Sequence, residues 1–298
     1  MRFADGIGNA QVAKALVSMA DSGRVAHAML MYENEGCGAL ALALAYVQYL
    51  NCAHPVDGDS CGECLSCRQM SKLIHPDVHY VFPVNKGPKT SDDKPTSESY
   101  IKYWRELALA NPYFTEADLQ RAIGIESKNG LIAVAEAKFI INTLSLTSVA
   151  DGYKAVILYL PEKMNQETAN RLLKMVEEPP EKTIFIFITH SPEKVLQTIF
   201  SRCQSVRVMP LSKEEAAQVK ALNPFDDSEE YDRFMDLFAD LMRAVASGDL
   251  QAALECGEMA AALESREKQK AFCTFAGQCI RKIFMIQQNM PQIADVAE

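Results

Sequence analysis

The sequence has no excess of basic residues. Lysine and arginine together number 30 against 39 aspartate and glutamate residues, which gives the 298-residue chain a formal net charge of −9. A protein that grips the DNA backbone by itself usually carries an excess of positive charge. Independent DNA binding is therefore not expected, although the other members of an assembly can supply that charge.

The sequence also lacks a signal and a long uncharged run. The N-terminal stretch MRFADGIGNAQ has no apolar segment of the kind found in secretory signals. The helix-forming uncharged stretch at residues 36–51 is shorter than the ~20 residues that a membrane-spanning helix needs. These two absences predict a cytoplasmic protein with no membrane partner. The composition, 48% hydrophobic and 23% charged, is that of an ordinary globular protein with enough length for two domains.

Four of the nine cysteines are close together at Cys52, Cys61, Cys64 and Cys67. Two successive C-x-x-C steps put three thiols on one loop, and the longer gap contains turn-forming residues that let Cys52 return as the fourth. Four thiolates around one ion form the closed tetrahedral geometry of a structural zinc site. The spacing therefore predicts bound Zn²⁺ with a structural role.

Three alternatives to zinc are weaker. An iron–sulfur cluster would share the C-x-x-C-x-x-C run, but the x3-C-P continuation is absent. Disulfides are typical of secreted chains, which this one does not resemble. Four unrelated thiols seldom fall at ligand spacing. The remaining cysteines are scattered, and we expect them to be buried reduced thiols: Cys37, Cys203, Cys256, Cys273 and Cys279.

A strand, a glycine-containing loop and a helix follow one another over residues 28–50. This is the context of a phosphate-binding loop, whose pattern G-x-x-x-x-G-K-[ST] supplies a lysine for the phosphates and a hydroxyl for magnesium. Here Glu33 replaces the first glycine and Gly38 keeps the second, while Ala39 and Leu40 replace the lysine and the hydroxyl residue. We expect the shape of the loop without its chemistry. A plain strand–turn–helix unrelated to nucleotides is the alternative.

A second nucleotide-site feature is missing from the buried strand at residues 154–160. An ATPase of this type carries two acids at the end of that strand, and this chain has Tyr159 and Leu160 there. Glu162 follows Pro161, and we expect it to be poorly placed as a substitute. The two independent losses predict that this chain binds and hydrolyses no ATP.

Strands alternate with helices over the first two thirds of the chain, which predicts a parallel sheet with helices on both faces. Predicted strands include residues 74–84, 130–134, 183–189 and 205–209. Predicted helices include one from Tyr100 capped by Ser99, one with a Thr115–Asp118 capping box, and a capped helix over 191–203. Only helical patterns occur after residue 210. We therefore predict an α/β domain at 1–210 containing the cysteine module 52–67, a linker at 211–225 and a helical domain at 226–298.

Several motifs occur in an order that resembles one protein family. They are residues 24–31, the degenerate loop, the four cysteines, His75-Pro-Asp, residues 170–180 (NRLLKMVEEPP), residues 183–189 and Ser201-Arg202-Cys203. This combination resembles the delta-prime subunits of the bacterial DNA polymerase III clamp loader, which are AAA+ proteins. The likeness covers about residues 1–210. The related gamma/tau subunits share the cysteines but would keep the lysine and acids that are missing here.

The resemblance implies a role for Arg202. In this family the arginine of Ser-Arg-Cys reaches the ATP site of a neighbouring subunit as an arginine finger in trans. A helix C-terminal arginine that faces the helix dipole is the alternative. Thr189 matches the family's sensor position, whose role depends on a bound nucleotide.

The resemblance also implies a function and partners. The expected function is a non-hydrolysing stator in a clamp loader that places the sliding clamp on primed DNA, with gamma/tau and delta subunits as partners. Contact with the clamp and with primer-template DNA would come through the complex. The alternatives are an active gamma/tau-like ATPase and a stand-alone zinc-stabilised module that binds nucleic acid.

Residues 85–125 depart from the family pattern and look like an insertion. Between Cys203 and Asn223 there is too little chain for the family's small helical lid, so either the lid is absent or the sequence is incomplete. The collar-type helical domain at 226–298 likewise ends early for a full collar.

Overall fold

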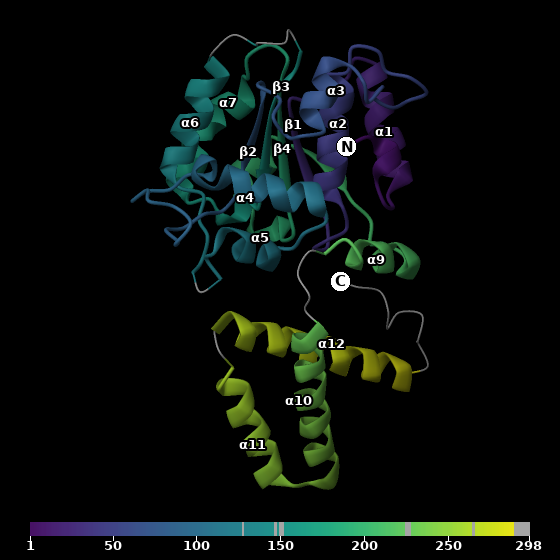
Figure 1. Cartoon of the computed structure of the whole chain (residues 1–298), viewed down its shortest axis with the longest axis vertical. Coiled ribbons are helices and arrows are strands. Elements are labelled where there is room, and N and C mark those ends of the chain that lie inside the picture. Colours follow the sequence, from purple (N-terminus) through teal and green to yellow (C-terminus); the bar gives the residue numbers. More distant parts are fainter. Residues whose placement is uncertain (127, 146–147, 149–151, 224–227, 264–265, 289–298) are drawn as a thin grey trace. The chain divides into compact units, whose positions relative to one another are not determined.

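The computed structural model describes residues 1–126, 128–145, 148, 152–223, 228–263 and 266–288 (Figure 1). The chain divides into two compact units, Met1–Pro224 and Phe225–Glu298. The first is an α/β unit and the second is helical. The predicted boundary of the helical domain at residue 226 and its end at residue 298 fall outside the described residues.

The described part of the first unit contains a five-stranded sheet with the order β2-β3-β4-β1-β5. All of the pairings are parallel. The strands are β1 (Ala28–Tyr32), β2 (Val78–Val81), β3 (Lys154–Tyr159), β4 (Thr183–Thr189) and β5 (Gln204–Arg207). β3 and β4 are buried along their whole lengths, as continuous apolar runs in a parallel sheet require. The predicted parallel α/β sheet is confirmed.

Helices cover both faces of this sheet (Figure 1). Alternate strand residues such as Leu30, Val156 and Phe187 share one core with α6 (Val134–Ser145) and α7 (Gln166–Glu177). Because side chains alternate between the faces of a strand, residues such as Met29 and Ile186 point to the opposite face. There α2 (Ala39–Leu50) contacts β3 and β4. All but its last residue is buried, because the helix has apolar residues on nearly all sides.

The remaining elements of the first unit surround this core. They are the short 3-10 helices η1 (Phe3–Asp5), η2 (Pro161–Lys163) and η3 (Pro192–Lys194), and the helices α1 (Ala10–Asp21), α3 (Leu65–Met70), α4 (Ser97–Ala110), α5 (Glu116–Ile123), α8 (Gln197–Phe200) and α9 (Lys213–Lys220). The capping box that begins α5 is present, with Thr115 and Asp118 bonded to each other's backbone N–H groups.

Three local predictions are wrong. Helix α4 begins three residues early because Thr96 is its N-cap, and Ser99 instead accepts the Thr96 backbone N–H. The predicted strand at 130–134 forms only isolated bridges, from Leu131 to Val84 and from Ile132 to Met164. The predicted helix at 191–203 is two short helical segments, η3 and α8, without a side-chain cap at Ser191.

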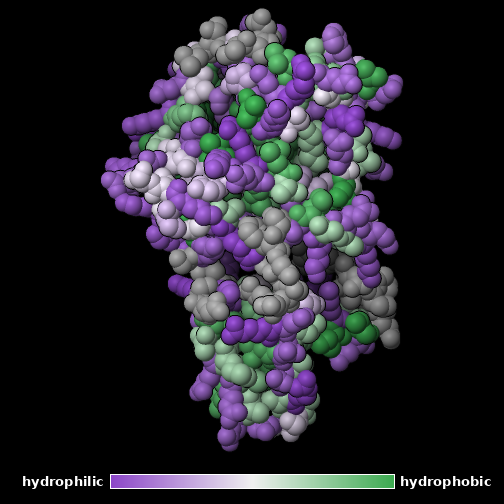
Figure 2. Space-filling view, in the orientation of Figure 1, coloured by the Kyte–Doolittle hydropathy of each residue, from purple (hydrophilic) through white to green (hydrophobic). Residues whose placement is uncertain are grey.

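The second unit consists of α10 (Ser228–Ser247), α11 (Leu250–Ala261) and α12 (Arg266–Gln287) in its described part. Hydrophobic side chains from the three helices and from the segment after α11 form its core: Phe234, Leu237, Phe238, Cys256, Leu263 and Phe272. None of the helices in the described part of the chain is long and apolar enough to cross a membrane. Hydrophilic side chains cover most of the visible face of the α/β unit, with hydrophobic ones scattered among them (Figure 2).

Candidate functional site

The carboxyl ends of β1, β3 and β4 meet at one edge of the sheet. Tyr32 at the end of β1 pairs with Thr189 at the end of β4, and Tyr159 at the end of β3 pairs with Ile188. In open parallel sheets this edge is where ligands bind, in the crevice beyond the strand ends. The degenerate loop Glu33–Gly38 leaves the same edge and leads into α2.

The side chain of Glu33 turns inward and fills the loop. Its Oε2 accepts the Ala39 backbone N–H at 2.7 Å, and the N–H groups of Gly38 and Cys37 also interact with it. Gly36 and Gly38 have φ angles of 81° and 104°, a left-handed backbone that glycine adopts without strain. The carboxyl group of Glu33 therefore occupies the N-terminus of α2, where exposed N–H groups would otherwise favour an anion such as phosphate.

Burial dominates the chemistry of Glu33. The residue is 7% exposed, and desolvation raises its pKa to about 8 although the backbone N–H groups oppose the shift. The sequence predicts that a carboxylate replaces the first glycine, but it does not show that this carboxyl group would bind the loop's own N–H groups. The available signal is an acidic residue a few positions before a helix whose N-cap is a glycine.

The strand end that lacks the two acids holds a tyrosine–histidine pair. Tyr159 Oη lies 2.9 Å from His190 Nε2, and Tyr159 is buried. Burial lowers the pKa of His190 to about 4, so its ring is neutral near neutral pH. His190 Nδ1 lies 3.9 Å from Glu33 Oε1, which brings the histidine to the filled loop. His190 belongs to none of the motifs recognised in the sequence, so sequence reasoning misses it.

Glu162 also lies at this edge of the sheet. Its Oε2 accepts a hydrogen bond from Thr189 Oγ1 at 2.8 Å, and its poor placement as a substitute for the two missing acids stays a prediction. The αL conformation of Leu160 (φ 60°) and the following 3-10 turn at Pro161 redirect the chain and bring Glu162 back to β4. Burial raises the pKa of Glu162. An acid is therefore present near the strand end and is bonded to Thr189.

Arg202 lies at the opposite edge of the sheet from this loop. It lies two residues before β5, which runs parallel to β1, so it is at the amino edge. Glu33–Gly38 instead follows β1 at the carboxyl edge. Its guanidinium forms an ion pair with Glu177 and donates to the Thr198 carbonyl at 2.8 Å. About a third of the side chain is exposed. This placement separates Arg202 from the loop of its own chain.

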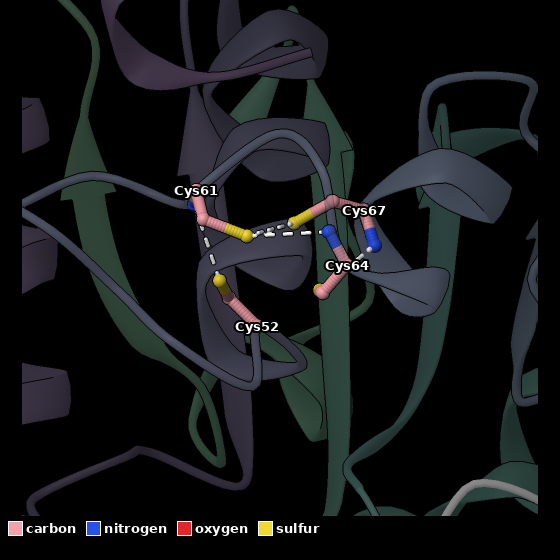
Figure 3. A group of neighbouring side chains, drawn as sticks. All are labelled: Cys52, Cys61, Cys64 and Cys67. Carbon is pink, nitrogen blue, oxygen red and sulfur yellow. Dashed lines mark hydrogen bonds between the residues drawn. The ribbon is translucent and has the colours of Figure 1, made fainter.

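The four predicted metal-ligating cysteines are together in the structure. Their Sγ atoms all lie within 4.8 Å of one another, and the side chains converge from the loop and the start of α3 (Figure 3). Cys61 Sγ and Cys67 Sγ are 3.9 Å apart. Zinc–sulfur bonds of ~2.3 Å in a tetrahedron require sulfur separations of about 3.8 Å. The geometry fits a four-coordinate metal ion.

Backbone N–H groups donate hydrogen bonds to sulfur atoms of this cluster. Cys52 Sγ accepts the Cys61 N–H at 3.2 Å, and Cys61 Sγ accepts the Cys64 N–H at 3.4 Å. The N–H groups of Cys64 and Glu63 lower the pKa of Cys61 to about 6, whereas burial raises the pKa of Cys52 and of Cys67. A thiolate is the form that binds metal, so the loop favours that form at Cys61 but not at every ligand.

The histidines near the cluster are not part of it. His75 is buried and its Nδ1 accepts the Asp77 N–H at 3.2 Å, His79 packs edge-on against Phe139, and His54 is exposed. These three histidines are therefore loop or packing residues. Among the other cysteines, Cys37 and Cys256 are buried as expected, whereas Cys203 and Cys279 are half-buried and Cys273 is exposed, contrary to expectation.

The fold and these sites define a parallel α/β unit with a filled phosphate-type loop and a four-cysteine module. Residues 8–212 match the family described as DNA polymerase III, delta subunit. That match covers more than half of the chain, so the chain belongs to this family.

Named relatives agree with this assignment. The chain is 29% identical over 178 residues to DNA polymerase III subunit delta' of Pseudomonas aeruginosa, covering 60% of this chain and 42% of that protein. It is 32% identical over 192 residues to the same subunit of Yersinia pestis, covering 64% and 44%. It is 30% identical over 200 residues to subunit gamma/tau of Mycobacterium bovis, covering 67% and 27%. The matches therefore span less than half of the length of each of these relatives.

Proposed function

We propose that this chain is a non-hydrolysing subunit of a bacterial DNA polymerase III clamp loader, a stator that assists ATP-driven placement of the sliding clamp on primed DNA. The observation that carries the proposal is the carboxyl group of Glu33 on the backbone N–H groups at the start of α2. A group that already accepts those hydrogen bonds competes with phosphate for them. Ala39 and Leu40 add neither a cation nor a magnesium ligand.

The proposed partners follow from the family. Relatives named delta' and gamma/tau subunits of DNA polymerase III match this chain, so gamma/tau and delta subunits are the expected neighbours in a hetero-oligomer. The net charge of −9 supports contact with DNA only through that complex. A replication role of this kind belongs in the cytoplasm.

Arg202 is proposed as an arginine finger for a neighbouring subunit's ATP. Its position at the amino edge, away from the Glu33 loop, and its partial exposure support action in trans. An arginine presented to a transferring phosphoryl group stabilises the charge that develops there. Such a finger lets a subunit without a working nucleotide site contribute to hydrolysis elsewhere in the assembly.

The metal of the cysteine module is proposed to be Zn²⁺ with a structural role. Four sulfur ligands leave no open coordination position, as in structural zinc sites. The bound ion would join the loop at 52–61 to α3 and so stabilise this part of the α/β unit.

Two measurements test the proposed function. Titration of the isolated chain with magnesium–ATP should give no saturable binding, and saturable binding would contradict the proposal in favour of an active ATPase. Mixing the chain with gamma/tau and delta subunits should give one complex by native mass measurement. Gel-shift binding of primed DNA by the lone chain at physiological salt would instead favour a stand-alone nucleic-acid-binding module.

A further inference from the structure

Tyr113, in the segment between α4 and α5, contacts the N-terminal stretch of the chain. Its hydroxyl accepts the Ile7 backbone N–H at 2.5 Å and donates to the Ile7 carbonyl at 3.1 Å. One side chain thus pairs with both backbone groups of a residue 106 positions away. Tyr113 is only 4% exposed, so these bonds are shielded from water.

The ring of Tyr113 also lies against the filled loop. A Cβ atom on Gly38 would come within 2.6 Å of the Tyr113 ring, and one on Gly36 within 3.4 Å of the Tyr113 carbonyl oxygen. A side chain at Gly38 would collide with the ring, so the glycine and the tyrosine are fitted to each other. Tyr113 therefore contacts the loop from outside, while Glu33 fills it from within.

The residues after Tyr113 continue along the same edge of the sheet. Glu116 N–H donates to Glu35 Oε1 in the loop at 2.5 Å, and Tyr159 Oη lies 3.4 Å from the Phe114 carbonyl. The Glu116 carboxylate pairs with Lys163 Nζ at 2.8 Å, just after β3. The stretch Tyr113–Glu116 is thus tied to the N-terminal stretch, to the loop and to the ends of β3 and η2.

A cavity of about 900 Å³ adjoins this contact. Gly38 and Ala41 of the loop and α2, Ile7 and Ala10 of the N-terminal region, and Tyr113 itself line part of it. This volume is in the range of sites that hold small ligands. Tyr113 lies where the cavity meets the loop, so a ligand that reached from the cavity to the loop would have to displace it.

We propose that Tyr113–Glu116, here called the plug segment, takes the place of a ligand over the Glu33–Gly38 loop and holds that loop in one conformation without nucleotide. This inference rests on the proposed function as a subunit that binds no nucleotide. It assigns a purpose to part of the 85–125 insertion. In a stator, a loop that is fixed from both sides gives the neighbouring subunits a constant surface throughout the ATP cycle.

Hydrogen exchange of the full-length chain tests the plug. Tyr113→Phe removes only the hydroxyl, so exchange of the Ile7 amide should accelerate roughly 3- to 10-fold, the effect of one lost hydrogen bond. Tyr113→Ala should also accelerate exchange of the amides at positions 37–39, by about 10-fold or more. Tyr103→Phe is the matched control, because it makes the same chemical change in α4, where the ring contacts Lys89. It should leave both regions unchanged.

The outcomes separate this inference from the proposed function. If Tyr113→Phe leaves exchange at Ile7 within about twofold of the parent chain, the plug is refuted, even if Tyr113→Ala fails to fold. Magnesium–ATP binding by the parent chain would refute the proposed function, whereas the exchange data would still decide whether the segment fixes the loop. Faster exchange in both regions together with no nucleotide binding by the parent chain supports both.

Discussion

The cysteine module and the Glu33–Gly38 loop are two small loops in one unit that have opposite relations to a ligand. In the cysteine module, four sulfur atoms face one another at distances that suit a bound metal ion. In the other loop, donor groups that favour an anion are already bonded to Glu33. One loop therefore offers ligands to an external ion, while the other is satisfied by the chain itself.

Among the variants that test this comparison, loss of a metal ligand should lower the free energy of unfolding most. Cys67 is fully buried, and its replacement by alanine removes one of four ligands. Since structural zinc binding is coupled to folding, Cys67→Ala should lower the free energy of unfolding by more than about 4 kcal/mol. Elemental analysis should find one zinc per parent chain and little in the variant. The exposed Cys273 gives the control, Cys273→Ser. Iron, or no metal at all, in the parent chain would contradict the assignment.

Removing the buried carboxyl group of Glu33 should have the next largest effect on the free energy of unfolding. Glu33→Ala leaves buried N–H groups at the start of α2 without their acceptor, so the free energy of unfolding should fall by about 2 kcal/mol. Chemical denaturation measures this change. Glu193→Ala, at an exposed position, should change stability by less than about 0.5 kcal/mol. Equal effects of the two variants would show that Glu33 does not stabilise the loop.

The raised pKa of Glu33 predicts a pH dependence. The folded-state pKa is about 8 against an ordinary value of 4.5, so between these values the folded chain holds a proton that the unfolded chain lacks. The free energy of unfolding should therefore fall as pH rises from about 4.5 to about 8. Glu33→Gln should remove this part of the decline.

The comparison of parent and Glu33→Gln isolates this effect from other groups. Burial also raises the pKa of Glu136, to about 7, and lowers that of His190, to about 4. The lowered pKa of His190 changes the free energy of unfolding in the opposite direction. The stability that it contributes is lost as pH falls from 6.5 towards 4. Glu136 is present in both chains, and thermal or chemical unfolding over pH 5 to 8 gives the difference. Parallel pH profiles of the two chains would contradict the shift at Glu33.

Arg202 should have the smallest effect on the stability of this chain. Its pair with Glu177 is partly exposed, so Arg202→Ala should cost less than about 1 kcal/mol. The same variant should lower the ATPase rate of a complex reconstituted with gamma/tau and delta subunits. Arg207→Ala, at the other end of β5, is the control for lost charge. Unchanged turnover with Arg202→Ala would remove the finger hypothesis.

Much of the fold follows from local pattern. The sequence shows the apolar runs of β3 and β4 and the almost entirely apolar α2 directly, because burial on every side requires such a composition. The failures are short elements. Residues 130–134 are apolar enough for a strand, yet they meet only isolated partners. The start of α4 depends on which of two hydroxyl residues caps the helix, Thr96 or Ser99, and both types suit that position.

The sequence by itself determined the four-cysteine module and the absence of the lysine and acids of a nucleotide site, because both depend on residue type and spacing along one short segment. Tertiary structure alone decided where Glu33 directs its carboxyl group, that Glu162 returns to Thr189, and that Tyr113 bonds to Ile7. These contacts join residues that the sheet topology and turns bring together. The physical reason is that hydrogen bonds and burial depend on how close groups lie in space. The separation of two residues along the chain does not specify that distance.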